Sequence, residues 1–366
     1  MSLCEPLNWT SKLEKMQRLL DSWRVRRLTL QGKIIIIKSL AIPKIVYTTS
    51  FLPIPHNFVK NVNRILYNFL WSKNERIKRT VLINGYEKGG LKMIDIEAHT
   101  LALKAAWLPR IYKDCNNVWP YLGKAYIEKA TGGLIQQMNL CSKKQFPRLE
   151  TIPTFYQDVV IGYCKANIPE KVSSKCDLYS QSIWGNRQLL CQDKCLFSQT
   201  FINSGYIYVK DVLLENGKMT NDIYENLVCK KNYFRTISMI QSALKPYKQL
   251  RFSEDYTHPD IQESNIVFEK CKWFYDEILK QKAVTAKAIK HWTDYFETDV
   301  EWYQVYCNKL KSQLETKIAE FNYKLINGIL PTGNNLFKWK RAHDTCCIYC
   351  HTLYHDAKHL LFECMH

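Results

Sequence analysis

Several classes of protein are excluded by what this sequence lacks. No stretch approaches the roughly 18 uninterrupted apolar residues of a membrane-spanning helix, because lysines interrupt GKIIIIKSLAIPKIVY. The first residues, MSLCEPLNWT, do not show the charged-then-apolar order of a signal peptide. The sequence also contains no glycine-rich nucleotide loop and no recognisable hydrolase arrangement around its histidines. We therefore expect an intracellular protein, cytoplasmic or nuclear, that does not partner with a membrane.

Cysteine is abundant, but its distribution does not indicate disulfides. The 14 cysteines are scattered through a large chain without a secretory signal, so reduced thiols are expected. Cys191 and Cys195 are close in sequence, yet no further Cys or His pair lies nearby to complete a metal site. Only the C-terminal cluster has the spacing of metal ligands.

The charge is strongly positive and uneven along the chain. The net charge is +18, and the residues through Lys113 hold 20 Lys and Arg against 7 Asp and Glu, or +13. The remaining residues hold 32 against 27, or +5. A basic surface of this kind suits a polyanion, which favours a nucleic acid as partner over a charge that serves only solubility.

Hydrophobic periodicity predicts a mainly α fold with two or three packed units in its 366 residues. Helices are expected over 12–30, 56–72, 95–111, 267–282 and 301–330. The apolar stripe of the helix over 56–72 consists of Phe58, Val62, Ile65 and Phe69. The stripe of the last helix is Leu310, Leu314, Ile318, Phe321 and Leu325.

Two regions show β-strand signals. RTVLI at 79–83 and GLKMI at 90–94 are β-prone runs on either side of a turn-rich NGYEKG, which predicts a small hairpin. The middle of the chain, 114–250, has four prolines between Pro120 and Pro169 and little sustained periodicity. Short helices and a possible strand pair are expected there, around 184–217.

The C-terminal stretch CCIYCHTLYHDAKHLLFECMH has the spacing of a zinc site. Cys347-x2-Cys350 forms a knuckle, and His359-x4-Cys364 is the natural second pair of ligands. A short helix would present the second pair, with Leu360, Leu361 and Phe362 as a small core beneath the metal. Four protein ligands close the coordination sphere, which indicates a structural zinc and not a catalytic one.

Two alternatives stay open for this cluster. His355 stands at the spacing of a retroviral zinc knuckle from Cys350, but only His359 supplies the H-x4-C of that knuckle. Cys346 is a spare thiol or an alternative ligand. If it binds no metal, the cluster is an incidental Cys/His-rich tail.

The surroundings of the cluster carry a family resemblance. FNYKLINGILPTGNNLFKWK, followed by CIYC and HLLFEC, resembles the zinc-binding C-terminal region of LINE-type (non-LTR) retrotransposon reverse transcriptases. WRVRRLTLQGKIIIIKSLAIPKIVY, FLPIP, NFLW and GGLKMIDIEAHTLALKAAWLPRI resemble the stretch that follows the polymerase palm in that family. IWGNRQLL and GYIYVKDVL match more weakly, in the expected order.

The resemblance implies a domain order. Residues 1–112 would be a basic helical thumb-like region with a small hairpin, and 113–250 a connecting region. Residues 251–340 would be a helical C-terminal region and 341–366 a zinc module, with Cys347, Cys350, His359 and Cys364 as ligands.

The chain departs from the family at the catalytic site. Polymerase chemistry uses paired palm carboxylates that hold two metal ions, and the family carries them in an aromatic-x-Asp-Asp motif. This sequence has no adjacent Asp pair. We therefore expect an inactive part of an RNA-directed DNA polymerase, such as a truncated element or partial gene product, with the catalytic Mg²⁺ belonging to a palm absent from this sequence.

The resemblance also suggests which residues contact RNA, an RNA–DNA hybrid or DNA. A basic thumb helix lies along the template–primer duplex and contacts phosphates, and the residues for it are Arg24, Arg26, Arg27, Lys33 and Lys38. A second set before the zinc cluster would clamp single-stranded RNA: Lys338, Trp339, Lys340 and Arg341.

Two rival interpretations remain. The chain is a zinc-stabilised helical module that binds another protein, or it is an element remnant without function.

Overall fold

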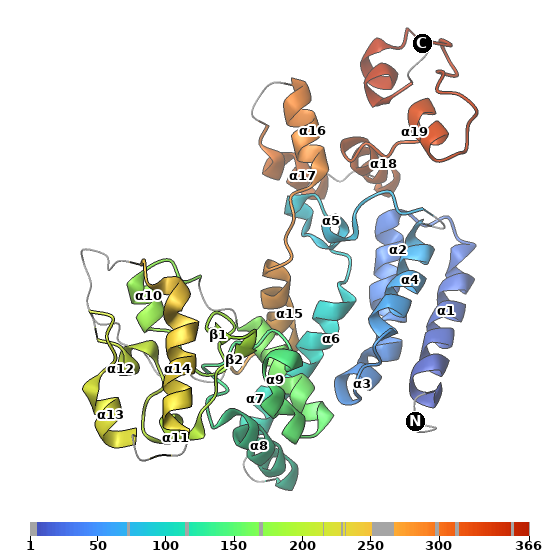
Figure 1. The fold of residues 1–366 in the computed structure, drawn as a ribbon. Coiled ribbons are helices and arrows are strands. Elements are labelled where there is room, and N and C mark those ends of the chain that lie inside the picture. The colour runs from blue at the N-terminus through green and yellow to red at the C-terminus, as the bar shows by residue number, and fades with distance from the viewer. Residues whose placement is uncertain are drawn as a thin grey trace. The chain divides into compact units, whose positions relative to one another are not determined.

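The computed structural model describes residues 6–71, 74–113, 117–167, 171–214, 216–227, 230, 232–250, 267–296, 300–311, 315–352 and 355–365. Over these residues the fold is mainly α, as predicted, with one two-stranded sheet (Figure 1). The chain forms two compact units. The first unit comprises Met1–Thr48, Ile54–Glu97 and Leu279–His366, and the second comprises Thr49–Pro53 and Ala98–Ile278. The four-segment division that the family resemblance implies (1–112, 113–250, 251–340 and 341–366) is not tested by these two units and stays a prediction.

The first unit begins with packed helices. A π-type turn, η1 (Pro6–Thr10), leads into α1 (Ser11–Arg24), and α1 and α2 (Leu30–Ile36) both pack against α4 (Phe58–Trp71). Met16 and Leu20 of α1 are fully buried. All four residues of the predicted stripe in 56–72 are buried as well, which confirms that helix and its inner face.

The predicted helix over 12–30 is shorter than expected. It ends at Arg24, and Thr29 starts the next helix by accepting a hydrogen bond from the Gly32 N–H with its side-chain oxygen (3.1 Å). A π-type turn, η2 (Ile37–Ala41), follows α2, and Pro43 then opens α3 (Pro43–Phe51). Proline is tolerated in a first helical turn because its missing N–H is not needed there.

The predicted hairpin at 79–83 and 90–94 is wrong. RTVLI forms a helical turn, α5 (Arg79–Ile83), and a 3-10 turn, η3 (Tyr86–Lys88), follows it. The segment after η3 folds back on α5, since the N–H groups of Leu91 and Met93 both donate to the Leu82 carbonyl (3.0 and 2.9 Å). A Cβ on Gly90 would lie 2.0 Å from the Asn84 carbonyl oxygen. Close backbone packing has overridden the β propensity of these runs.

The second unit is built on helices from the middle of the chain. The predicted helix over 95–111 is broken into α6 (Ile96–Ala105) and α7 (Trp107–Lys113). The reason is Pro109, which has no N–H to donate to the carbonyl of Ala105 and therefore fits only an early turn. α7 packs against α8 (Val118–Thr131) and α9 (Thr154–Ala166).

The strand pair found among the described residues lies in this unit, within the range where a pair was expected. β1 (Leu190–Cys191) and β2 (Lys194–Cys195) are antiparallel, and the turn residues Gln192 and Asp193 have φ values of +50° and +59°. Positive φ at both central residues is typical of a two-residue hairpin turn. The short elements of the unit are η4 (Lys143–Gln145), η5 (Pro147–Thr151), α10 (Lys175–Tyr179), α11 (Gln199–Asn203), α12 (Val209–Val212), α13 (Asn221–Leu227) and η6 (Lys245–Tyr247). The longer helix α14 (Tyr233–Leu244) also belongs to it, as does most of α15 (Cys271–Lys280).

The C-terminal helices belong to the first unit and correct another expectation. They are α16 (Lys287–Phe296), α17 (Trp302–Lys311), α18 (Thr316–Ile326) and α19 (Gly333–Lys338), so the predicted helix over 301–330 is two helices. Ile318 and Phe321 of its predicted stripe are exposed, while Leu310 and Leu314 lie outside the described side chains. Tyr306 and Tyr323 are buried instead. Both tyrosines lie outside the predicted stripe.

Among the described helices, none by itself has the length and apolar character to cross a membrane. Leu30–Ala41 and Pro43–Phe51, bent by 49°, meet those criteria only as a pair.

Candidate metal centre and basic cluster

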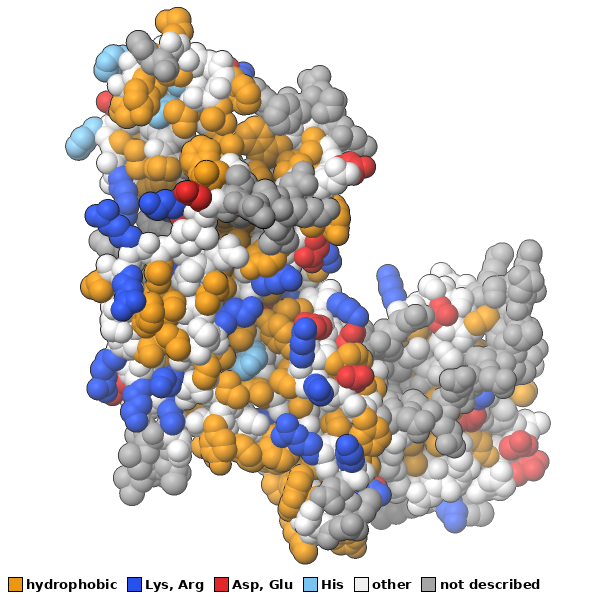
Figure 2. Space-filling view, turned by 180° about the vertical axis from the view of Figure 1, so that it is seen from behind, with side chains coloured by type: hydrophobic (Ala, Val, Ile, Leu, Met, Phe, Trp, Pro, Cys, Tyr) orange, Lys and Arg blue, Asp and Glu red, His pale blue; other side chains and the backbone are white. Residues whose placement is uncertain are grey.

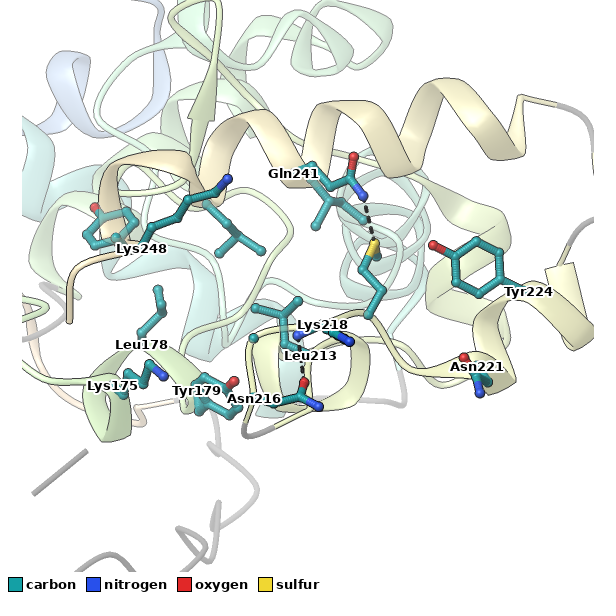
Figure 3. A pocket seen from close by; sticks show the side chains of 15 residues that line it. Lys175, Leu178, Tyr179, Leu213, Asn216, Lys218, Asn221, Tyr224, Gln241 and Lys248 are labelled. Atoms are coloured by element: carbon teal, nitrogen blue, oxygen red, sulfur yellow. Dashed lines mark hydrogen bonds between the residues drawn. The ribbon is translucent and has the colours of Figure 1, made fainter. Parts of the chain in front are cut away.

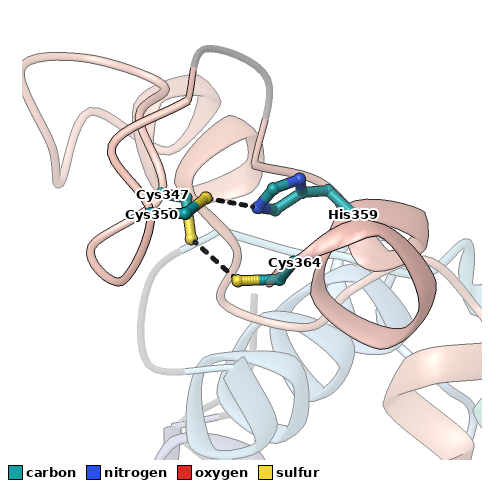
Figure 4. Close-up of side chains that lie close together, drawn as sticks. All are labelled: Cys347, Cys350, His359 and Cys364. Atoms are coloured by element: carbon teal, nitrogen blue, oxygen red, sulfur yellow. Dashed lines mark hydrogen bonds between the residues drawn. The ribbon is translucent and has the colours of Figure 1, made fainter. Parts of the chain in front are cut away.

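The structure brings Cys347, Cys350, His359 and Cys364 together, with all four ligand atoms within 4.8 Å of one another (Figure 4). The sulfur atoms of Cys347 and Cys364 are 3.9 Å apart, and Cys350 Sγ is 3.1 Å from His359 Nε2. Zn–S bonds of about 2.3 Å in a tetrahedron place two sulfur atoms about 3.8 Å apart. The four side chains can therefore hold one tetrahedral metal ion.

Local backbone structure explains both halves of the spacing. The Cys347-x2-Cys350 knuckle is closed by hydrogen bonds from Cys347 N–H to the Thr352 carbonyl and from His351 N–H to the Cys347 carbonyl, both 3.0 Å. His359 and Cys364 lie at the two ends of a π-type turn, η7 (His359–Glu363), in which the Cys364 N–H donates to the His359 carbonyl (2.8 Å). In a π-type turn each hydrogen bond joins residues i and i+5, so residues five positions apart lie on the same side of the turn.

The small core predicted beneath the metal is wrong. Leu361 and Phe362 are exposed, and Leu360 is half-buried. The buried side chains at the centre are Cys347, His355 and His359, with rings of the two histidines 5.8 Å apart and nearly perpendicular. The π-type turn directs Cys364 toward the knuckle and leaves the intervening apolar residues outside.

His355 and Cys346 do not join the four-residue cluster. His355 is buried, and its Nδ1 accepts a hydrogen bond from the N–H of Gly333 at the start of α19 (3.0 Å). Its carbonyl also accepts from the N–H of Asn334 (3.0 Å). His355 therefore attaches the knuckle to α19, which accounts for a histidine that the spacing left as a possible ligand.

The electrostatics of the cluster favour thiolates, which are the form that binds metal. Hydrogen bonds from the hydroxyl and the backbone N–H of Thr352 lower the pKa of Cys350 to about 6. Burial raises the pKa of Cys347, but hydrogen bonds from the backbone N–H groups of Cys350 and Tyr349 outweigh it, and this pKa lies below its ordinary value. The contact with Cys347 raises the pKa of His359.

A second feature of the first unit is a cluster of cations from four parts of the chain. We call it the basic cluster: Arg24, Lys33, Arg76, Lys324 and Arg341. Its members are close enough for their charges to interact. Burial lowers the pKa of Lys33, Glu320 raises it, and Arg24, Lys324 and Arg76 each lower it. Burial and then Arg341 lower the pKa of Arg76. Figure 2 shows many Lys and Arg side chains on one face of the molecule.

Direct contacts hold the basic cluster together. The Lys33 ammonium donates to the Leu70 carbonyl (3.0 Å), and the Arg76 guanidinium lies 4.0 Å from the centre of the Trp339 ring. Glu320 lies among the cations, accepting from the Leu30 N–H (2.9 Å) and pairing with Lys324 (3.4 Å). Arg24 pairs with Asp21 at 3.5 Å. Five cations against two carboxylates leave a surplus of three positive charges.

The structure therefore brings part of the two predicted nucleic-acid sets together. Arg24 and Lys33 from the first set and Trp339 and Arg341 from the second belong to the cluster or contact it. Arg76 and Lys324 were missed, because only packing shows that they lie near Lys33 and Arg341, which are distant in sequence.

The remaining residues of the two sets lie elsewhere on the first unit. Arg26 stacks on Trp23 (4.3 Å), and Arg27 is exposed. Lys38 donates to the Lys92 carbonyl (3.1 Å). Lys338 and Lys340 are exposed, and Lys340 has a φ of +57°.

A scan of known protein families returns no family model that matches this chain.

Proposed function

We propose that the chain is a nucleic-acid-binding part of a LINE-type reverse transcriptase that contacts template RNA and the primer duplex. The retrotransposon origin rests on the sequence resemblance at the two ends of the chain. The binding function rests on one observation, the basic cluster with its surplus of three positive charges. Neutralising phosphates with such a cluster releases counterions and drives binding to any nucleic acid.

The side chains of the cluster suit this role. Guanidinium groups pair with phosphate oxygens through two parallel hydrogen bonds, and the cluster has three arginines. Trp339 is half-exposed beside them with Arg76 against its ring, so it combines an aromatic surface with positive charge. Bases stack on aromatic rings in this setting, particularly in single strands. The chain has no adjacent Asp pair for polymerase chemistry, so the proposed role is binding alone.

The binding test compares two double variants of equal charge. Arg24→Gln with Arg341→Gln removes two cations of the cluster. Arg64→Gln with Arg235→Gln removes two exposed arginines outside it. We expect the first pair to weaken binding to an RNA–DNA hybrid and to reduce the slope of log K against log salt by about 0.9 for each lost phosphate contact. The control pair should change the slope much less.

If the chain does not bind the RNA–DNA hybrid at 50 mM salt, the proposal is refuted. Equal losses in the two double variants would mean that net charge, and not the cluster, determines binding.

We also propose that the metal held by the cysteine cluster is a structural zinc ion. Three sulfur ligands and one imidazole form a closed set of the kind used by zinc fingers and knuckles. Purified protein should contain about one equivalent of zinc, and Cys347→Ser with Cys350→Ser should remove it. Cys346→Ser is the matched control and should retain the metal, because Cys346 lies outside the four-residue cluster. Zinc content that is unchanged in the double variant would reject the assignment.

A further inference from the structure

A groove of about 800 Å³ lies in the second unit, between α14 on one side and α10 with Leu213 and residues 216–221 on the other (Figure 3). Its floor is apolar and buried, and it consists of Leu178, Tyr179, Ile240 and Leu244. Two tyrosines hold the walls, since the Tyr179 hydroxyl donates to the Leu214 carbonyl and the Tyr247 hydroxyl donates to the Gln188 carbonyl. Sites of 300–1,000 Å³ with an apolar lining and a few placed polar groups are typical of ligand binding.

The charged side chains that line the groove are all lysines. Lys175 and Lys248 approach one end from opposite walls, and Lys218 lies farther along (Figure 3). The described lining contains no Asp or Glu, although Glu215 falls outside the described residues. No ion pair is found for Lys218 or Lys248 within the described part of the chain. The nearby Asp177 is already engaged, accepting hydrogen bonds from Ser173 and Ser174.

The spacing of these groups indicates the shape of the occupant. The lysines are distributed along the groove and do not converge on one point, so they suit several negative charges on an extended ligand more than one compact anion. Three amide side chains also line the groove: Asn216, Asn221 and Gln241. Amides offer both donors and acceptors, which match the N–H and C=O groups of a peptide backbone.

The same features favour a peptide over a nucleic acid. The lining has no arginine to pair with phosphates, and three of its four floor residues are aliphatic, so the floor itself offers little surface for stacked bases. Outside the floor, the aromatic residues of the lining are Tyr224 and Tyr247. We propose that this groove binds an extended acidic peptide segment of a partner protein. An aliphatic or aromatic side chain of the peptide packs on the floor, and flanking carboxylates face Lys175, Lys218 and Lys248. This function is separate from nucleic-acid binding by the first unit.

The test uses the full chain and a fluorescein-labelled peptide, Glu-Asp-Leu-Phe-Asp-Glu, followed by fluorescence anisotropy. Lys218→Gln with Lys248→Gln should weaken binding about tenfold or more, because both lost charges face the ligand. Lys230→Gln with Lys245→Gln is the matched control, since both lysines are exposed and neither lines the groove. It should change the affinity less than about twofold. Replacing Leu-Phe of the peptide by Ser-Gly should also abolish tight binding, because the floor then loses its apolar partner.

Three results would overturn the proposal. The first is an equal loss of peptide affinity in the two double-lysine variants. The second is undiminished binding of the Ser-Gly peptide. The third is displacement of the peptide from the groove by single-stranded RNA. The Arg24→Gln and Arg341→Gln variant separates this proposal from the nucleic-acid one, because peptide binding should not change in it.

Discussion

At the scale of single residues, burial determines the chemistry of Lys104. Its side chain is almost completely buried in the second unit, where the ammonium donates to the Leu52 carbonyl (2.9 Å) and lies 4.8 Å from the centre of the Phe155 ring. Burial lowers its pKa to about 8, while Asp158 acts in the opposite direction and Lys143 adds to the lowering. The folded protein therefore holds a cation in a place that disfavours positive charge.

This burial predicts a pH-dependent stability difference between the wild type and Lys104→Met. Between pH 8 and about 10.5 the unfolded lysine binds a proton that the folded one has released, so this group makes the wild type more stable as pH rises. Met carries no charge, so its advantage over Lys should be largest at pH 7 and should shrink by at most about 3 kcal/mol up to pH 10.

Urea unfolding of both proteins at several pH values measures this difference. Subtracting the two curves removes the opposing contributions of Cys164 and Cys195, whose pKa values burial raises to about 12. Lys129→Met, at an exposed position of α8, should differ from the wild type by a constant amount. A constant difference for Lys104→Met as well would contradict the prediction.

At the scale of elements, the start of α19 fits against the metal knuckle because residue 333 is glycine. A Cβ at this position would lie 2.7 Å from the Thr345 carbonyl oxygen and 2.9 Å from that of Cys346. Those two residues immediately precede Cys347, the buried ligand. Close packing therefore requires Gly333, whose place in a helix would otherwise favour alanine.

Gly333→Ala should consequently destabilise the metal module. On helix propensity alone the change would stabilise by up to about 1 kcal/mol, whereas overpacking against backbone costs about 1–3 kcal/mol. We expect the second effect to dominate and zinc to be released more readily to a chelator. Competition with a chromophoric chelator gives the affinity, and Asn334→Ala, which adds no Cβ, is the control. Unchanged or tighter zinc binding in Gly333→Ala would show that the contact is easily relieved.

At the scale of the whole molecule, two units with separate cores divide the proposed functions. The candidate metal centre and the basic cluster belong to the first unit, and the lysine groove belongs to the second. Metal binding contributes its free energy to the unit that contains the ligands.

Removal of the metal should therefore affect one unfolding step and not both. With excess EDTA we expect calorimetry to show a lower midpoint for the first unit. A ligand at 100 times its Kd contributes about 2.7 kcal/mol. Cys347→Ser with Cys350→Ser should reproduce this shift without EDTA and then be insensitive to it. A single transition, or equal shifts of two transitions, would contradict independent units.

Local sequence by itself determined the features that depend on neighbours along the chain. The stripe from Phe58 to Phe69 predicted the buried face of α4, because helical periodicity is a property of consecutive residues. The spacing from Cys347 to Cys364 likewise selected the four side chains that now lie together. The knuckle and the π-type turn are each closed by hydrogen bonds between residues at most five apart, so no distant part of the chain was needed to identify them.

Tertiary structure alone decided what depends on residues that are distant in sequence. RTVLI became a helical turn because backbone packing at Gly90 outweighed its β propensity, and His355 became an anchor for α19 and not a ligand. The basic cluster joins Arg24 to Arg341, and the groove combines α10 with α14. Periodicity and spacing describe local geometry, whereas such contacts depend on how whole helices pack.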